Sequence, residues 1–469
     1  MTIRIRIKPL VFLLVLALFA GVFYFALNSG KQKGLHEYVR RGFAFMDKNK
    51  HDKGLKLLLL AHKSLPQSEK IKNELLRGYL RYASHLQSEG KIEAALKLLD
   101  DAYAVNDKNQ SLIMSLSYLY SKLGVSKIKN GLLVEGKEYL EKGISVAMQS
   151  KRARKDISTY LFSEAVTAYE HKDHSTAVIC LNSSYLLWSR FKTLYLLGFL
   201  YYAEANPQTA LFYWKKAAMI DRDNKELNEY LRRASEEVLL EEKKAIIETE
   251  HFNITLYRPY DLDAERLTEM LEKIFLEVGR DLDHYPSSKT PIVIYDEGDF
   301  RNVFKQPYVI RGFYDGSIRI PITIDVNSPA FSVILAHEYT HAVVSILTNR
   351  KCPAWLNEAI ATYEQAKYAP VYLSRLKAFL DNGGTLSIKV LTDGFISIGD
   401  NAKTILSYEG AFTVAAFIID KWGWVSMRRL LKRIKEGRHY SNAIDEEFLV
   451  SVETFEKMWN NFAKGRCNE

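Results

Sequence analysis

Cysteine is scarce in this 469-residue chain, with three residues, Cys180, Cys352 and Cys467. An odd and scattered set of cysteines is no disulfide framework, and no Cys-x-x-Cys pair is present to hold a structural zinc ion. We therefore expect hydrophobic cores to hold the fold. Apolar residues make up 47% of the sequence, and the chain is too long for a single core. About two or three domains follow from that length.

A motif of arginines and aromatic residues, such as nucleic-acid-binding modules carry, is also missing, so we expect no nucleic-acid partner. The formal net charge is +9, but it is unevenly distributed. From Ile246 to the end there are 26 basic and 30 acidic residues, so the positive excess lies in the N-terminal half. A basic half favours an anionic membrane surface or an acidic partner.

The N-terminus contains a long apolar segment. Three basic residues within the first eight positions precede an uncharged apolar run from Leu10 to Leu27, and this run is close to the minimum length for a membrane span. A cleaved signal peptide usually has a shorter run, of roughly 7–15 residues, followed by a small-x-small site. The sequence "FALNSG" is a poor site of that kind. We therefore expect residues 1–30 to be an uncleaved signal anchor, with a cleaved signal peptide as the alternative.

The charges beside that run predict its orientation. Basic flanks stay in the cytoplasm, which places the residues from Lys31 onward outside it. We expect a single-pass protein of the inner or cytoplasmic membrane whose bulk is extracytoplasmic, and periplasmic if the cell is Gram-negative.

Proline is nearly absent from residues 35–240, which contain only Pro66 and Pro207 and look helical throughout. Small residues recur there at intervals of 41, 41, 41 and 33 positions, each followed seven positions later by another small residue, with a large apolar residue between the two. The first small residues are Gly54, Ala95, Gly136, Ala177 and Ala210, the second are Ala61, Ala102, Gly143, Ser184 and Ala217, and the large ones are Leu58, Leu99, Leu140, Leu181 and Trp214. Small residues seven apart share one helical face and let a neighbouring helix approach closely.

The unit "TLYLLGFLYYAEANPQTALFYWKKAAMIDRDN" resembles the tetratricopeptide repeat (TPR), with Leu197, Gly198 and Tyr201 at the family's positions. The family's period is about 34 residues, so the wider intervals in this chain imply longer first helices or loops. We expect residues 31–247 to be an all-α solenoid of about five helical hairpins, which would usually bind a protein or peptide partner. The charged run over residues 225–250 is expected to be a capping helix. A plain helical array outside the family is the alternative.

The sequence changes character from residue 248 onward. "HFNITLY" alternates like a strand, "AERLTEMLEKIFLEVGRDL" is amphipathic at the helical period, and "PIVIYD" is a short buried strand. "GFYDGSIRIPI" predicts a pair of strands or an edge strand around residues 315–316. Ser328 is a good N-cap and Pro329 suits a first helical position, so a helix should run to about Leu347. We expect an α+β domain over residues 248–469.

Within that helix, the stretch "VILAHEYTHAVV" places two histidines and a glutamate in an apolar run. His337 and His341 lie one turn apart on one face, so both imidazoles can bind one ion. Glu338 is rotated by about 100° around the helix axis from His337, so its carboxylate does not bind the ion. This pattern predicts a Zn²⁺ site in which the ion lowers the pKa of a bound water and Glu338 takes the proton. Histidines satisfied by ordinary hydrogen bonds are the alternative, but buried titratable groups are costly without a strong partner.

The site needs a third ligand. The pattern HExxHxxGxxH is absent, because Val344 and Leu347 occupy its last two positions. The next helix, "CPAWLNEAIATYEQAKYAP", opens at Pro353 and holds two glutamates. Glu358, one turn into that helix, is the preferred ligand. Glu364, nearly two turns further on, is the competing candidate.

HEYTH followed by "PAWLNEAIATYE" resembles the peptidase MA-like, or gluzincin, family of zinc metallopeptidases. That family typically shows HExxH and then a Trp-Leu-x-Glu-Gly-x-Ala helix; Trp355, Leu356, Glu358 and Ala361 match, and Ala359 stands where glycine is usual. The resemblance covers about residues 248–465.

The resemblance implies a role for each site residue. It makes His337, His341 and Glu358 the zinc ligands and Glu338 the general base. It also implies that the strand from Tyr314 to Pro321 lines the cleft and pairs with an extended peptide. Tyr408, in "SYEGA", stands where relatives often keep a tyrosine that could stabilise the oxyanion; a purely packing tyrosine is the alternative.

The sequence therefore predicts a multidomain protein with an N-terminal transmembrane anchor, a TPR-like solenoid and an α+β zincin-like metallopeptidase domain. We expect it to hydrolyse peptide bonds as an endopeptidase or an aminopeptidase-like enzyme, with one zinc ion, a protein or peptide substrate and a protein partner on the solenoid. Two alternatives remain open. One is a non-catalytic membrane-tethered scaffold with a structural zincin-like domain, for which Glu338 would be unnecessary. The other is a metal-dependent hydrolase of a non-peptide amide.

Overall fold

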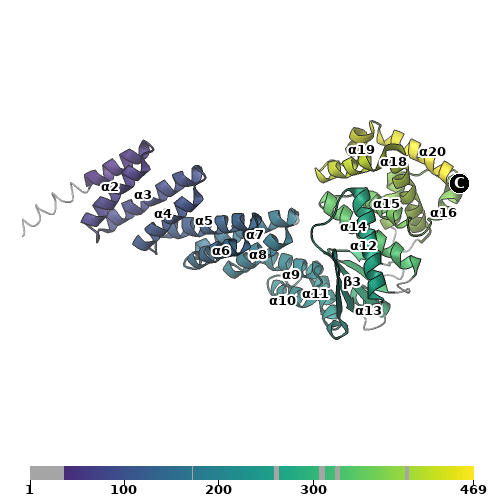
Figure 1. Cartoon of the computed structure of the whole chain (residues 1–469), viewed down its shortest axis with the longest axis horizontal. Helices are drawn as coiled ribbons and strands as arrows, with labels where there is room; N and C mark the ends of the chain where they lie inside the picture. The colour runs from purple at the N-terminus through teal and green to yellow at the C-terminus, as the bar shows by residue number, and fades with distance from the viewer. Residues whose placement is uncertain are drawn as a thin grey trace, which may run out of the picture. The chain divides into compact units, whose positions relative to one another are not determined.

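The computed structural model has two compact units (Figure 1). It describes residues 36–171, 173–257, 263–305, 312–322, 328–396 and 401–468. The expected membrane anchor, residues 1–30, lies outside the described residues and stays a prediction. The first unit comprises Met1–Tyr169 and Ser175–Ser189, and the second comprises Glu170–His174 and Arg190–Glu469.

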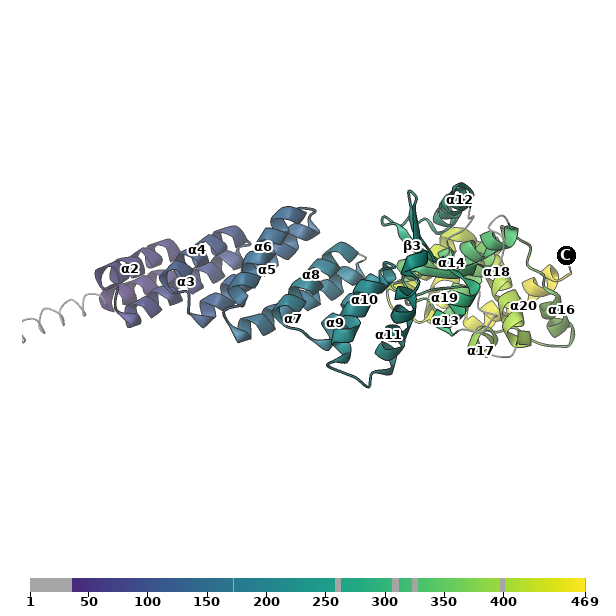
Figure 2. The same cartoon turned by 90° about the horizontal axis from the view of Figure 1, so that it is seen from below.

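Helices account for nearly all the described residues of the first unit (Figure 2). Residues 36–47 are helical and are followed by α2 (His51–Ser64), α3 (Glu69–Ser88), α4 (Ile92–Val105), α5 (Gln110–Lys129), α6 (Leu133–Ala147), α7 (Lys151–Glu170) and α8 (His174–Leu187). Helices that follow one another along the chain contact each other from α2 through α6. Side-chain oxygens of Ser68 and Asn109 cap the N-termini of α3 and α5.

The predicted small-residue positions are helix contacts in the structure. All fifteen of these residues are buried. Each repeat contributes two small residues and one large residue, and the three lie together on one helix: α2, α4, α6, α8 or α10 (Pro207–Ala218). A Cβ atom on Gly136 would come 2.7 Å from the carbonyl oxygen of Gly124 on the preceding helix, which explains why a small residue is needed there. The TPR-like register is therefore confirmed.

Longer first helices account for the wider intervals between the repeats. The helices α3, α5 and α7 have 20 residues each, whereas α9 (Phe191–Ala203), which starts the unit with the shortest interval, has 13. The sequence offered longer helices or longer loops as explanations, and the structure has the longer helices.

The second unit begins with the last repeat helices, α9, α10 and α11 (Lys225–Val238). The boundary expected near residue 247 thus lies inside this unit. The predicted capping helix is correct only as far as Val238, because a short 3₁₀ helix, η1 (Glu241–Lys243), and the strand β1 (Ala245–Glu248) follow it. The β-branched Ile246 and Ile247 suit a strand, and they pair with β2.

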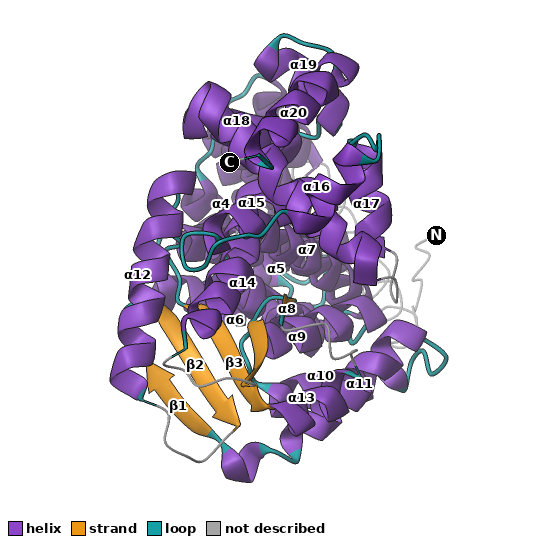
Figure 3. Cartoon of the chain, turned by 90° about the vertical axis from the view of Figure 1, so that its right-hand side faces the viewer, coloured by secondary structure: helices purple, strands orange, loops and turns teal. Residues whose placement is uncertain are grey.

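The second unit contains a five-stranded sheet (Figure 3). Its other strands are β2 (Phe252–Tyr257), β3 (Thr290–Asp296), β4 (Phe313–Tyr314) and β5 (Ile318–Ile322). The order is β1-β2-β3-β5-β4, in which β2, β3 and β5 are parallel and the two edge strands are antiparallel to their neighbours. The predicted strands are confirmed, including the pair around residues 315–316.

Helices cover both faces of this sheet. The isoleucines of β3 and β5 join the main core with residues of α12 (Ala264–Leu282) and α14 (Pro329–Thr348). Side chains alternate between the faces of a strand, so Val293 and Tyr295 point the other way, where they pack with residues of α13 (Glu297–Phe304). The helix α11 contacts α13 on that second face.

The remaining helices complete the core around α14. They are α15 (Ala354–Gln365), α16 (Ser374–Asp381), α17 (Ile388–Ile396), α18 (Asn401–Lys435, interrupted at Gly423 with φ 75°), α19 (Tyr440–Phe448) and α20 (Val452–Arg466). Both α15 and α18 contact α14. Among the described helices, α14 and α18 have the length and apolar composition of a membrane span, and both contribute side chains to this core.

Candidate metal centre

Two consecutive helices, α14 and α15, carry the predicted ligands. The helix α14 starts as its sequence predicts, with the Ser328 hydroxyl accepting a hydrogen bond from the amide of Ala330 and Pro329 at the first helical position. It ends at Asn349, which adopts a left-handed conformation with φ 52°. After a short connection, Pro353 precedes α15, which packs against α14.

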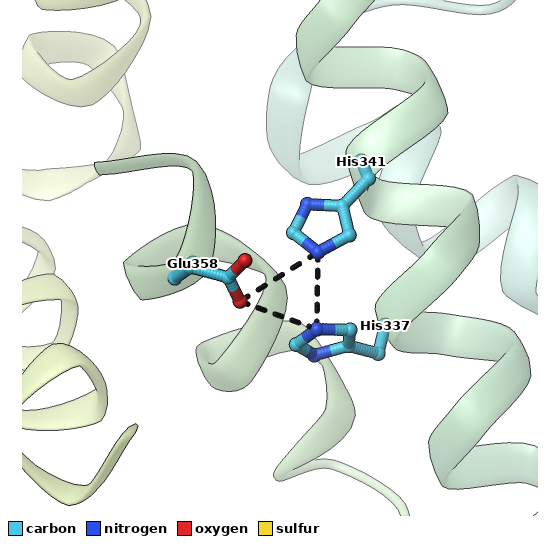
Figure 4. Close-up of side chains that lie close together, drawn as sticks. All are labelled: His337, His341 and Glu358. Atoms are coloured by element: carbon cyan, nitrogen blue, oxygen red, sulfur yellow. Dashed lines mark hydrogen bonds and ion pairs between the residues drawn. The ribbon is translucent and has the colours of Figure 1, made fainter. Parts of the chain in front are cut away.

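The side chains of His337, His341 and Glu358 converge on one point (Figure 4). The two imidazole Nε2 atoms lie 3.0 Å apart. The Oε2 atom of Glu358 lies 3.4 Å from Nε2 of His337 and 3.7 Å from Nε2 of His341. One turn of α14 separates the histidines, and Glu358, one turn into α15, supplies the carboxylate.

This triangle of atoms fits a zinc ion. Zinc–nitrogen and zinc–oxygen bonds of about 2.0–2.1 Å in a tetrahedral site place ligand atoms about 3.3 Å apart. The three separations, 3.0, 3.4 and 3.7 Å, lie around that value. In addition, Oε2 of Glu358 is buried and has no hydrogen-bond partner among the described residues. A buried carboxylate oxygen in that situation needs a strong partner, and a cation would supply one.

The competing glutamate, Glu364, is not part of this group. It is buried, with 1% of its surface exposed, and its carboxylate accepts a hydrogen bond from the Lys367 ammonium group. Lys367 also bonds Asp281 of α12. Glu364 therefore belongs to an ion-pair cluster on another side of α15.

Charges at the centre act differently on the two nearby carboxyl groups. Burial raises the pKa of Glu358, but His341 and His337 outweigh that effect and leave its pKa below the ordinary value. Burial raises the pKa of Glu338 to about 7, although His341 acts in the opposite direction. Glu358 is thus favoured as a carboxylate ligand, whereas Glu338 sits where its charge is less stable.

Glu338 stands beside the triangle without being part of it. It is buried, with 6% of its surface exposed, and its Oε2 atom has no hydrogen-bond partner among the described residues. Gly312, just before β4, lies against it, since a Cβ atom there would come 2.9 Å from Oε1 of Glu338. A carboxyl group held in place but not bound by a structural partner is available to exchange a proton.

Tyr408 of α18 is close to the same centre. Its ring centroid lies 6.2 Å from that of His337 and 5.2 Å from that of Phe395. Burial raises the pKa of its phenol, and the charges of Glu358 and Glu338 add to this effect. The hydroxyl group therefore stays protonated near neutral pH, as a hydrogen-bond donor must be.

The triangle opens into a cleft of about 530 Å³. Of the strand expected to line the cleft, Tyr314 to Pro321, only Tyr314 and Asp315 do so, together with Gly312 and Phe313. The strand β5 is buried instead, so this expectation is correct only at its start. Phe199, Tyr230 and Arg350 also line the cleft, and sequence reasoning missed all three. Phe199 and Tyr230 belong to the repeat helices α9 and α11. The sequence pattern of a repeat helix does not indicate contact with a site that lies more than 100 residues further along the chain.

Comparison with known proteins locates one family within the chain. Residues 312–465 match the family model of the Peptidase MA superfamily. That segment contains the HEYTH motif, Glu358 and Tyr408. No curated protein matches the chain.

Solved structures similar to the chain include two tetratricopeptide proteins. One is a thermophilic TPR protein from Thermus thermophilus, 20% identical, covering 43% of this chain and 98% of that one with a TM-score of 0.19. The other is the TPR domain of P58(IPK), 15% identical, covering 91% of this chain and 99% of that one with a TM-score of 0.18. TM-scores this low support no superposition of the structures. The assignment of TPR-like repeats therefore rests on the helical hairpins of this chain and their buried small residues. The chain thus joins an array of tetratricopeptide-like hairpins to a segment that matches the Peptidase MA superfamily.

Proposed function

We propose that this protein is a zinc-dependent metallopeptidase of the gluzincin type. The observation that carries the proposal is the convergence of two imidazole nitrogens and a carboxylate oxygen within 4.8 Å of one another. The buried Glu338 beside them and the match of residues 312–465 to the Peptidase MA superfamily support the same function. A purely structural zinc site would have no use for Glu338.

The residues of the centre have separate tasks in peptide hydrolysis. His337 and His341, through Nε2, and Glu358, through Oε2, would hold the ion. Zinc, when bound, supplies Lewis-acid chemistry that polarises a carbonyl group and makes water more acidic. Glu338 takes the proton from the attacking water and delivers it to the leaving amine. The Tyr408 hydroxyl donates a hydrogen bond to the oxyanion that forms as the carbonyl carbon is attacked.

The edge strand β4 would position the substrate. Among the strands that the structure describes, it is the last of the sheet and pairs with β5 alone. Phe313 and Tyr314 of β4 also line the cleft. An extended peptide that pairs with this edge would lie beside the metal centre, as in other cases of strand addition to a sheet.

The rest of the chain would bring substrates to this centre. We propose that residues 1–30 anchor the protein in the inner or cytoplasmic membrane and that the folded units lie outside the cytoplasm, in the periplasm if the cell is Gram-negative. The repeat helices would bind a protein partner or the substrate, because stacked helical hairpins commonly bind proteins or peptides.

A metal-exchange experiment on the full-length protein in detergent tests the proposal. The protein is incubated with a peptide library as purified, after chelation, and after zinc is restored, and products are identified by mass spectrometry. We expect cleavage to be lost on chelation and recovered with zinc. Zinc bound at about one ion per chain without cleavage of any peptide or protein substrate would favour the scaffold function instead.

A further inference from the structure

The last repeat hairpin is bonded to the strand pair that lines the cleft. The hydroxyl group of Ser317 donates a 2.7 Å hydrogen bond to the carbonyl oxygen of Ala203, the last residue of α9. The guanidinium group of Arg319 donates a 3.0 Å hydrogen bond to the carbonyl oxygen of Tyr202. The end of α9 therefore holds the turn between β4 and β5.

A buried ion-pair network extends this attachment to α11. Arg319 is fully buried, and it lies 2.8 Å from Glu237 of α11 and 3.0 Å from Asp315. The hydroxyl groups of Tyr202 and Tyr295 donate to the same oxygen of Glu237. Buried charges persist only where partners surround them in fixed positions, so this network fixes α9 and α11 against the sheet.

Aromatic side chains of these helices consequently form one wall of the cleft. Phe199 of α9 and Tyr230 of α11 line it, with ring centroids 6.3 Å apart in an edge-to-face arrangement. Tyr230 also stacks on the buried Trp214, with ring centroids 5.0 Å apart. These ring contacts hold the side chains of Phe199 and Tyr230 in fixed orientations.

Arg350 stands at one end of that wall. It follows α14, has a φ of 60°, and places its guanidinium carbon 5.3 Å from the centroid of the Phe199 ring. The cleft-lining residues Ser345 and Thr348 lie between His341 and Arg350 along the chain. The stretch of helix from His341 to Thr348 spans about 10 Å, at about 1.5 Å per residue. An extended peptide covers that distance with about three residues.

The charges of the cleft favour an anionic group near Arg350. Among the lining residues that the structure describes, Arg350 is the one side chain with a permanent positive charge. Of the acidic lining residues, Asp315 lies 3.0 Å from Arg319, Glu358 belongs to the metal centre and Glu338 stands beside that centre. A substrate carboxylate placed between the aromatic wall and Arg350 would meet an apolar surface and a cation.

We propose that Phe199, Tyr230 and Arg350 form a subsite that binds a carboxylate group of the substrate, about three residues from the scissile bond. This inference rests on the proposed peptidase function. The carboxylate belongs either to an acidic side chain or to the C-terminus of the peptide, because both present the same group. The repeat array thereby contributes to substrate selection through its last hairpin.

A matched peptide set tests the subsite in the full-length protein. The peptides carry glutamate, glutamine or lysine at one position, and each is made with a free and an amidated C-terminus. Cleavage is measured with the native protein, and binding with the Glu338→Gln variant. We expect a preference for carboxylate-bearing peptides of about fivefold in both, since a partly exposed ion pair is worth at most about that factor. Loss of the preference on amidation identifies the C-terminal carboxylate as the source, and its retention identifies the side chain.

Charge variants show whether Arg350 causes the preference. Arg350→Gln should abolish it, and Arg350→Glu should invert it in favour of lysine, with zinc content unchanged. Arg438→Gln is the control, because Arg438 is an exposed arginine of the same unit that pairs with Glu446. Equal cleavage of all peptides by the native protein together with equal binding by Glu338→Gln, or a preference unaltered in Arg350→Glu, would overturn the subsite. A binding preference without any cleavage would instead count against the peptidase function alone.

Discussion

At the scale of single residues, Gly312 determines how closely the chain approaches the carboxylate of Glu338. A Cβ atom at this position would lie 2.9 Å from Oε1 of Glu338 and 2.7 Å from Cγ2 of Ile320. Contacts this short force one of the two neighbouring side chains to move, and Ile320 is fully buried in the core. The added methyl group would therefore displace Glu338, on which the proposed proton transfer depends.

We predict that Gly312→Ala lowers turnover while zinc content stays the same. A displacement of the base by about 1 Å can reduce the rate by roughly 100-fold. Turnover and zinc per chain are measured on the same preparation. Gly465→Ala serves as the control, because a Cβ atom there meets nothing within 4 Å. Equal turnover in the two variants would show that Glu338 tolerates the added methyl group.

Much of the candidate site was predictable at this scale, because its signal is local. The helical period places His337 and His341 on one face, and Glu358 follows on the next helix, so three ligands could be named from spacing and resemblance. Arg350 and Phe199 could not be named. Their place in the cleft depends on a contact between segments that are far apart in the sequence, which no local pattern records.

At the scale of helices and strands, the prediction was most accurate where a periodic pattern had a clear start. The amphipathic helix α12 has the bounds of its predicted stretch, and its Asp263 side chain caps it. The prediction was wrong after Val238, where a run rich in charge looked helical but residues Ala245–Glu248 pair with β2. Pairing of β1 with β2, the next strand along the chain, overrides local helical preference.

The attachment of α11 to the sheet leads to a prediction for Glu237→Ala. The variant leaves the fully buried Arg319 without one of its two carboxylate partners. Loss of one partner from a buried ion pair reduces the free energy of unfolding by about 3–5 kcal/mol. Glu236→Ala, at the adjacent and less buried position, should have little effect. Urea unfolding of the two variants measures the difference, and similar midpoints would contradict the role given to the network.

The repeat register makes a separate prediction for Ala102→Leu in α4. Ala102 is fully buried, and overpacking of a tight helix contact destabilises by about 1–3 kcal/mol. Ala104→Leu changes the same helix at an exposed position and should be nearly neutral. Thermal unfolding compares the two variants, and zinc content should be native in both. A stable Ala102→Leu protein would mean that the register does not describe the packing.

At the scale of the whole molecule, the basic residues before the apolar run at Leu10–Leu27 predict a membrane topology. Positive flanks remain in the cytoplasm, so the C-terminus should be outside it. A reporter that is active only outside the cytoplasm, fused after Glu469, should be active, and the protein should stay in the membrane fraction after a high-salt wash. Activity of a reporter that works only in the cytoplasm would contradict this topology.

The central claim is that two histidines and Glu358 hold zinc while Glu338 does not. Zinc per chain, measured by mass spectrometry beside peptide cleavage, separates these roles in three variants of the full-length protein. Glu358→Ala should lose zinc together with activity. Glu364→Ala is the control and should keep its zinc, because Glu364 bonds Lys367 instead.

Glu338→Gln is the decisive variant. It preserves shape but cannot accept a proton, so zinc should remain near one ion per chain while turnover falls by about 10²–10⁴-fold. Full turnover in Glu338→Gln, or zinc lost from Glu364→Ala and retained in Glu358→Ala, would contradict the account.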